Sequence, residues 1–249
     1  SGILASWGDG RRGKSTRTKF VMIDPHYSIT ASKADEWIPI NPGTDGALAL
    51  GIAHEILVRG LWDQKFVGKF KDTSGKFVEG KEADEKSWED AVTTGLVKWW
   101  NLFLKDFPPA LASSKTGIPE GTIKRLAQEL AKTKPAIAQR GRGSTAWPGN
   151  GLYNSYAIYV LNALTGNLEI KGGLNHPASV SYSPEPTPIT QDEVALAGTK
   201  KPIIDEKGTL KFPNAGVVTN NAADNILKDF PYPIEVALGW WNNWTFSAP

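Results

Sequence analysis

One helix-forming stretch without a polar face constrains the fold more than any other feature. Residues Ala47 to Val58 read ALALGIAHEILV, so a helix formed there would carry apolar side chains on nearly every side. A helix that is apolar all round belongs inside a core rather than on a surface. A chain of 249 residues is long enough to build a core around it. We therefore expect a buried helix at 47–58, covered by other elements.

Short apolar runs alternate with helical patterns on both sides of this helix. Lys19 to Asp24 predicts a buried strand that ends in a turn. Strands alternating with helices predict an α/β fold with a mainly parallel, Rossmann-like sheet and flanking helices. From Lys171 to about Thr219 the pattern dissolves into a long surface loop. The other expected elements are extended pieces at 37–40, 136–139 and 234–238 and helices at 88–104, 119–132 and 152–164.

Composition excludes several classes of function. The chain has no cysteine, so these residues hold no disulfide, thiolate metal site or iron–sulfur ligand. The net charge is only +2, which gives no reason to expect a nucleic-acid partner. No apolar run reaches the roughly 18 residues needed to span a bilayer. The N-terminal SGILASW also lacks the basic start of a signal peptide.

Two glycine-rich motifs resemble nucleotide-binding signatures, but their surroundings do not fit. Gly8 to Ser15, GDGRRGKS, matches the Walker A pattern. A P-loop needs a helix of several turns directly after it, and only three residues separate Ser15 from the first expected strand. Gly141 to Ala146, GRGSTA, matches a dinucleotide fingerprint, but the following WPGNG argues for a loop instead of a helix. We read the first motif as a solvated basic connection and the second as a loop that can approach a ligand closely.

The turns that follow the first expected strand make a better candidate site. Parallel α/β sheets bind ligands in the crevice beyond the carboxyl ends of their strands. Asp24 follows the first strand directly, in the turn Asp24 to Ser28, and its carboxylate can bind a ligand or form an Asx turn before Pro25. A second turn, Pro42 to Gly46, opens the buried helix, and Thr44 is a good N-cap there. Asp45 favours the positive end of the helix and can accept two hydrogen bonds from a guanine edge.

The histidines do not suggest a metal site. His26, His54 and His176 are widely separated, and we predict no metal ligands among these residues. His54 lies within the apolar helix and is expected to be a buried histidine with its hydrogen bonds satisfied. His26 is the better candidate for a ligand contact because it follows the strand end.

Four ordered motifs resemble one enzyme family. They are VMIDPHYSITASKADEWIPINPGTDGALALGIAHEIL, LWDQKFV, GIPEGTIKRLAQELAKTKPAIAQRGRG and YAIYVLNALTGNLEIKGG, with a weaker match in GWWNNWTFSAP. In this order they resemble the molybdopterin oxidoreductases of the dimethyl sulfoxide reductase type. The combination of KADEWIPINPGTDGALA with GLVKWWN is most similar to the branch of arsenate, thiosulfate, polysulfide and tetrathionate reductases.

The resemblance implies a cofactor and a set of contacts. The cofactor would be bis(molybdopterin guanine dinucleotide) with molybdenum or tungsten. The two turns would contact the guanosine and pyrophosphate of one pterin, and the glycine-rich loop would lie near the pterin and metal. Arg142 or Arg140 would hold an anionic substrate, with a surface arginine as the alternative. The implied cofactor contacts are Asp24, Pro25, His26, Tyr27, Ser28, Gly43, Thr44, Asp45, Gly143, Trp147 and, less surely, Asn242.

The resemblance also implies a larger enzyme. Catalytic subunits of this family are about three times longer and usually carry a four-iron cluster upstream, so this chain looks like an internal segment of a multi-domain fold. Residues 1–133 would form the later part of one cofactor-binding α/β lobe, and residues 134–249 part of a second lobe with the loop near 171–219. The enzyme would reduce an oxyanion or sulfur compound in anaerobic respiration, in the periplasm, with electrons from an iron–sulfur subunit.

Two alternatives from other classes stay open on sequence alone. One is a nucleotide-binding α/β enzyme that uses either glycine-rich loop, which would need a helix directly after Ser15 or Ala146. The other is a non-catalytic α/β protein that assembles through tryptophan-rich surfaces such as Trp99-Trp100 and Trp240-Trp241.

Overall fold

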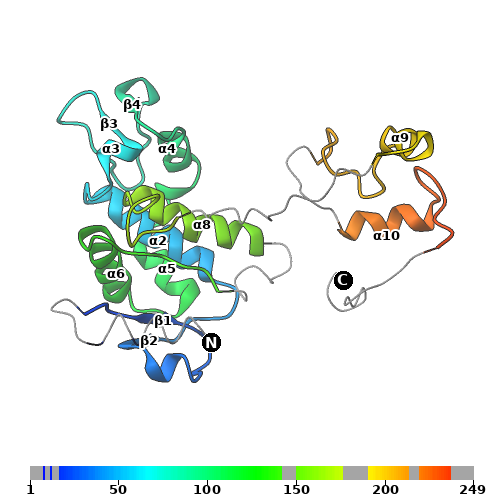
Figure 1. The fold of residues 1–249 in the computed structure, drawn as a ribbon. Helices are drawn as coiled ribbons and strands as arrows, with labels where there is room; N and C mark the ends of the chain where they lie inside the picture. Colours follow the sequence, from blue (N-terminus) through cyan, green and yellow to red (C-terminus); the bar gives the residue numbers. More distant parts are fainter. Residues whose placement is uncertain are drawn as a thin grey trace. The chain divides into compact units, whose positions relative to one another are not determined.

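The structure is a computed structural model that describes Gly8, Arg12 and residues 17–141, 150–175, 190–212 and 219–236 (Figure 1). The chain forms two compact units, Ser1–Ala178 and Ser179–Pro249. The elements are, in chain order, β1 (Val21–Ile23), η1 (Ala31–Lys33), β2 (Glu36–Ile38), α2 (Asp45–Val58), α3 (Gln64–Val67), β3 (Gly68–Phe70), η2 (Glu85–Ser87), β4 (Trp88–Asp90), α4 (Leu96–Trp99), η3 (Trp100–Leu104), α5 (Pro109–Thr116), α6 (Glu120–Lys132), α8 (Gly151–Leu164), α9 (Glu193–Thr199) and α10 (Thr219–Leu227).

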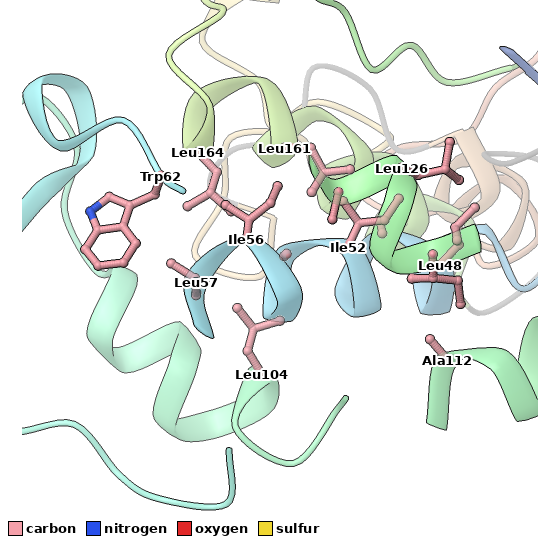
Figure 2. Close-up of a cluster of buried hydrophobic side chains, with 14 of the residues drawn as sticks. Leu48, Ile52, Ile56, Leu57, Trp62, Leu104, Ala112, Leu126, Leu161 and Leu164 are labelled. Carbon is pink, nitrogen blue, oxygen red and sulfur yellow. The ribbon is translucent and has the colours of Figure 1, made fainter. Parts of the chain in front are cut away.

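The helix α2 is the centre of the first unit, as its sequence predicts. Ala53 and Ile56 are fully buried, and α5, α6, α8 and η3 all pack against α2. Figure 2 shows Ile52 and Ile56 between leucines of α6 and α8 on one side and Leu104 with Ala112 on the other. Gly51 permits the close approach of α5, because a Cβ atom there would lie 2.5 Å from Cβ of Ala112. The expected buried helix is therefore confirmed.

The sheets are smaller and more mixed than expected. β1 and β2 are parallel, with Val21 opposite Glu36 and Ile23 opposite Ile38. β3 and β4 are antiparallel, with Phe70 opposite Trp88. The described residues thus contain one pair of each kind. A mixed helix and sheet fold with a small parallel sheet is confirmed, but the sheet is not mainly parallel within the described part of the chain.

The helix expected from Trp88 to Leu104 begins only at Leu96, so the prediction is wrong for its first half. Trp88 instead starts β4 and packs its indole against Phe70, with ring centroids 5.0 Å apart. Gly95 takes a left-handed conformation with φ of 87° directly before α4. α4 then continues into η3, a π-helix whose Trp100 is completely buried. Tertiary pairing with β3 therefore overrides the helical spacing of the first apolar residues.

The segment expected to form a strand at 136–139 pairs with side chains instead of with another strand. The amide of Asn162 on α8 accepts the N–H of Ala138 and donates to its carbonyl oxygen, both at 2.8 Å. Asn167 accepts the N–H of Ala136 in the same manner at 3.2 Å. Two side-chain amides thus take the place of a neighbouring strand, which corrects the strand prediction.

The helices α6 and α8 are confirmed near their expected bounds. α6 starts one residue after Pro119 and buries Ile123, Leu126 and Ala127 on one face. Lys19 bonds Glu129 on α6 at 2.9 Å, so a charged pair links α6 to the residues just before β1. No helix in the described part of the chain is both long and apolar enough to cross a membrane.

The second unit differs from what its sequence predicts. The expected loop at 171–219 is interrupted by α9, whose side chains are all exposed. Ile234 is not in a strand, because the described residues of this unit offer no neighbouring strand to pair with it. Residues 237 and 238 of the same prediction lie outside the described residues. The buried residues in the described part of this unit, Asp205 and Asn225, are polar, and Asn225 donates to the carbonyl oxygen of Ile204 at 2.7 Å.

Candidate functional site

The turn after β1 is held at the edge of the parallel strand pair. The carbonyl oxygen of Asp24 accepts the indole N–H of Trp37 at 2.9 Å, and the backbone N–H of Asp24 donates to Ile38 at 3.2 Å. The carboxylate of Asp24 accepts the N–H of His26 at 2.9 Å, which is the Asx turn considered from the sequence. Tyr27 packs edge-on against Trp37, yet 58% of it stays exposed. The backbone is fixed while the turn remains open to a ligand.

The start of α2 lacks the cap that its sequence predicts. Thr44 occupies the N-cap position, but its hydroxyl donates to the carbonyl oxygen of Asn41 at 2.6 Å and caps nothing. That part of the N-cap prediction is wrong, because Thr44 stabilises the preceding turn instead. Gly43 has φ of 78°, a conformation that glycine adopts without strain. The N-cap residue therefore leaves the first N–H groups of α2 without a side-chain cap, and the acidic side chain in the first turn is that of Asp45, which accepts its own backbone N–H.

The two aspartates of the candidate site interact with each other. Asp45 lies in the first turn of α2 and is half-buried. Burial raises the pKa of its carboxyl above the ordinary value, its own backbone N–H opposes this, and the nearby charge of Asp24 raises the pKa further. A charge that raises the pKa of another carboxyl lies near it, and here the charge of Asp24 acts on Asp45. The two turns therefore place their carboxylates in the same region.

The helix α8 brings a third segment to the start of α2. A Cβ atom on Gly46 would lie 2.3 Å from Oδ1 of Asn154, so the first turns of α2 and α8 touch at a point where only glycine fits. Asn150 is the N-cap residue of α8, and its side chain makes no capping bond either. In contrast, Asp63 and Asp192 cap the short helices α3 and α9 through their carboxylates. Among the described residues, the two long helices thus meet at ends whose N-cap residues make no side-chain capping bond.

The segment that leads into the glycine-rich loop runs along α8. Arg140 lies over the ring of Tyr159, with 5.7 Å between the guanidinium carbon and the ring centroid. Gly141 follows and is exposed. Ser155, one turn before Tyr159, is only 5% exposed, and its hydroxyl has no hydrogen-bond partner among the described residues. Buried hydroxyl groups are usually hydrogen-bonded, so a ligand or a water molecule is the expected partner of Ser155.

Several predicted contacts cannot be placed. Arg142, Gly143, Trp147 and Asn242 lie outside the described residues, as does His176. His54 is not available to a ligand, because it is 1% exposed and its Nδ1 lies 2.6 Å from the carbonyl oxygen of Leu104. That confirms it as a satisfied core histidine. The described part of the chain contains no group of three or more acidic, histidine or cysteine residues that could hold a metal ion.

Three residues of this region were missed from the sequence. Gly46 was read only as part of a turn, and Asn154 and Ser155 were read as part of an apolar helix. The available signal was two small polar residues within the apolar run LYNSYAIYVLNAL. A polar pair there has to meet either a partner or a ligand.

The two nucleotide-binding patterns remain without structural support. Residues 17–20 are not helical and β1 begins at Val21, so the helix that a P-loop requires does not fit after Ser15. Arg17 of the same basic run pairs with Asp35 at the surface. Of the GRGSTA motif only Gly141 is described, and residues 142–149 lie outside the described residues, so the helix that this motif would need after Ala146 stays untested.

Comparisons with known proteins show the family of this chain. Residues 7–234 match the profile of the molybdopterin oxidoreductase family. The molybdopterin-containing subunit of arsenate respiratory reductase from Chrysiogenes arsenatis is 46% identical over 250 residues, which is 95% of this chain and 29% of that protein. The corresponding subunit from Shewanella sp. (strain ANA-3) is 39% identical over 254 residues, 98% of this chain and 29% of that protein.

A solved structure shows a partial likeness. Acetylene hydratase from Pelobacter acetylenicus superposes with a TM-score of 0.46 at 26% identity, over 59% of this chain and 17% of that one. The chain spans 29% of the length of the two arsenate respiratory reductase subunits that it matches. The family profile covers far more than half of the chain. This chain therefore belongs to the molybdopterin oxidoreductase family.

Proposed function

We propose that the chain is the cofactor-binding segment of a larger molybdenum or tungsten oxidoreductase that reduces an oxyanion. Arsenate is the first substrate to test, because the two relatives described above are arsenate respiratory reductase subunits that match almost the whole chain. Thiosulfate, polysulfide and tetrathionate are the other candidates. Reduction would consume two electrons and two protons and convert arsenate into arsenite and water.

The observation that carries this proposal is the charge of Asp24 acting on the half-buried carboxyl of Asp45 in the first turn of α2. A guanine edge offers a ring N–H and an exocyclic amine, and carboxylates accept such pairs of donors. The first turns of α2 and α8, whose N-cap residues make no side-chain capping bond, would offer backbone N–H groups, and helix N-termini favour a phosphate. Because Gly46 has no side chain, its backbone is what α2 presents where it approaches Asn154 of α8. These features fit the guanine nucleotide tail of a molybdopterin.

The proposed contacts follow from this geometry and from the family resemblance. Asp24 and Asp45 would bind the guanine, and the backbone of Gly43 and Thr44 would bind the pyrophosphate. Arg140 or Arg142 would hold the anionic substrate. When bound, the metal with its pterins supplies the two-electron chemistry, while the chain's own residues position it. The remaining proposed contacts are Pro25, His26, Tyr27, Ser28, Gly143, Trp147 and Asn242.

The larger assembly is part of the same proposal. The β1–β2 pair would belong to a wider Rossmann-like sheet, with residues 1–133 in one lobe and residues 134–249 in a second. The full polypeptide would carry two guanine dinucleotide cofactors and a 4Fe–4S cluster and would receive electrons from an iron–sulfur subunit. We propose the periplasm as its compartment, in keeping with anaerobic respiration.

Cofactor analysis of the full-length polypeptide tests the proposal. The protein would be purified without oxygen, its metal content measured, and its guanine nucleotide released by acid and quantified. We expect molybdenum or tungsten with twice as many guanine nucleotides as metal ions. Oxidation of a reduced viologen dye would then be followed with each candidate acceptor, and arsenate should give the fastest rate. A protein without any pterin would contradict the proposal and favour a non-catalytic interaction domain.

A further inference from the structure

We propose that the hydroxyl of Ser155 donates a hydrogen bond to a phosphate oxygen of the bound cofactor. This inference rests on the proposed function and adds a contact from α8, a helix for which neither the motifs nor the comparisons name a binding residue. Its starting point is that Ser155 is 5% exposed and its hydroxyl has no partner among the described residues. A buried hydroxyl without a partner destabilises a protein unless something else completes its hydrogen bonds.

The contacts of α8 show which way Ser155 faces. Asn167, just after α8, meets Ala136, while Asn162 and Tyr159 on α8 meet Ala138 and Arg140. Earlier helix positions therefore face later positions of the neighbouring segment. Ser155 lies one turn before Tyr159 and two turns before Asn162 and therefore shares their face. Continuing the same register places Ser155 beside Gly141, where the segment leads into the glycine-rich loop.

The surroundings of this position favour an anion. Asn154, the neighbour of Ser155, touches Gly46 in the first turn of α2. The starts of α2 and α8 therefore meet within one residue of Ser155, and in the described part of the chain neither N-cap residue, Thr44 or Asn150, makes a side-chain capping bond. Both helices have fourteen residues, enough for a developed dipole. A hydroxyl donor beside two such helix ends suits a phosphate group better than it suits a cation.

The variant Ser155→Ala separates a ligand contact from a structural role. In cofactor-free full-length protein, made in a host that cannot synthesise molybdopterin, the change should leave the melting temperature unchanged or raise it, because it removes an unsatisfied hydroxyl. In the loaded protein it should accelerate the release of the pterin, followed by its fluorescence, by about 10- to 100-fold, since one hydrogen bond to a charged group is lost.

Ser114→Ala is the matched control. Ser114 is an exposed serine on α5 whose hydroxyl donates to Leu111 at 2.8 Å, and its loss should not change pterin release. Equal release rates for Ser155→Ala and the parent protein would overturn the inference, as would a lower melting temperature of the cofactor-free variant. If the parent protein itself binds no pterin, the proposed function fails, and that outcome is read from the parent before any variant is made.

Discussion

The two ends of α2 differ in how completely their polar groups are satisfied. At the C-terminal end, buried Glu55 pairs with Arg59, and His54 bonds the carbonyl oxygen of Leu104. At the N-terminal end, Thr44 does not cap the helix and Asp45 lies half-buried near a second carboxylate. The polar groups at the C-terminal end of α2 are thus paired, whereas those at its N-terminal end are not fully paired within the described residues. Proteins leave polar groups unsatisfied chiefly where a ligand or a function completes them.

The same contrast extends to the segments that each end contacts. Asp63, just beyond the C-terminal end, caps α3 and bonds Lys134 at 2.6 Å. Ser155, near the N-terminal end, has a buried hydroxyl without a partner among the described residues. We propose that the C-terminal end stabilises the fold and that the N-terminal end belongs to the proposed cofactor site. Substitutions at the two ends should therefore change stability in opposite directions.

The largest effect is expected from Trp100→Ala. This variant tests the C-terminal end of α2, because the ring centroid of Trp100 lies 5.3 Å from that of His54. Trp100 is completely buried, and its indole N–H donates to Lys81 at 2.9 Å. Loss of a buried tryptophan should lower the free energy of unfolding by about 3–5 kcal/mol. Urea unfolding followed by circular dichroism measures the change. Phe103→Ala in the same π-helix is the control, because Phe103 is 59% exposed and should lose under about 1 kcal/mol.

A smaller effect is expected from the charge of Asp63. Burial alone would raise the pKa of its carboxyl, but the hydrogen bonds from Lys134, Phe66 and Lys65 outweigh burial, so the pKa lies below the ordinary value of 3.8. A carboxyl with a lowered pKa stabilises the fold above its unfolded pKa, and this stability is lost as the pH falls through the folded value.

Asp63→Asn should remove this acid sensitivity while keeping a residue that can cap α3. The stability of the parent protein should fall more steeply than that of the variant as the pH decreases below about 4. At pH 7 the variant should lose only about 1 kcal/mol, because Lys134 is largely exposed and screened by solvent. If the stability of the two proteins fell in parallel at low pH, the ionised carboxylate of Asp63 would not stabilise the fold, and this prediction would be contradicted.

The sequence predicted those parts of the fold that depend on local periodicity. The helices α2, α6 and α8 were expected within two residues of their observed starts, because apolar spacing and the proline before α6 are local signals. β4 was not expected, since Trp88 is drawn into a strand by partners distant in sequence. The pairing of Ala138 with an asparagine side chain is equally non-local.

The candidate site divides in the same way. Asp24 and Asp45 could be selected from the sequence because each follows a strand or opens a helix, which is visible in the chain itself. Ser155 and the contact between Gly46 and Asn154 could not, because they depend on where α8 lies against α2 and on the segment before the glycine-rich loop. The first turn of a helix can be recognised locally, but the neighbour that it meets cannot.

Asp45→Asn tests the central contrast with the smallest expected change in stability. Folding raises the pKa of Asp45, so the folded chain holds a proton at pH values where the unfolded chain has lost it. The stability of the parent protein therefore falls as the pH rises from the ordinary value of 3.8 through the folded value. Asparagine does not ionise, so the stability of the variant does not fall in this pH range for this reason. The pKa direction already includes the opposing bond from the backbone N–H at the start of the helix.

The most direct measurement is the free energy of unfolding of cofactor-free Asp45→Asn and parent protein at pH 7. We predict that the variant is the more stable of the two, the opposite of the result for Asp63→Asn. A less stable Asp45→Asn protein would mean that Asp45 supports the fold as Asp63 does. The start of α2 would then stabilise the fold as its C-terminal end does, and the proposal that it is arranged to bind a cofactor would be contradicted.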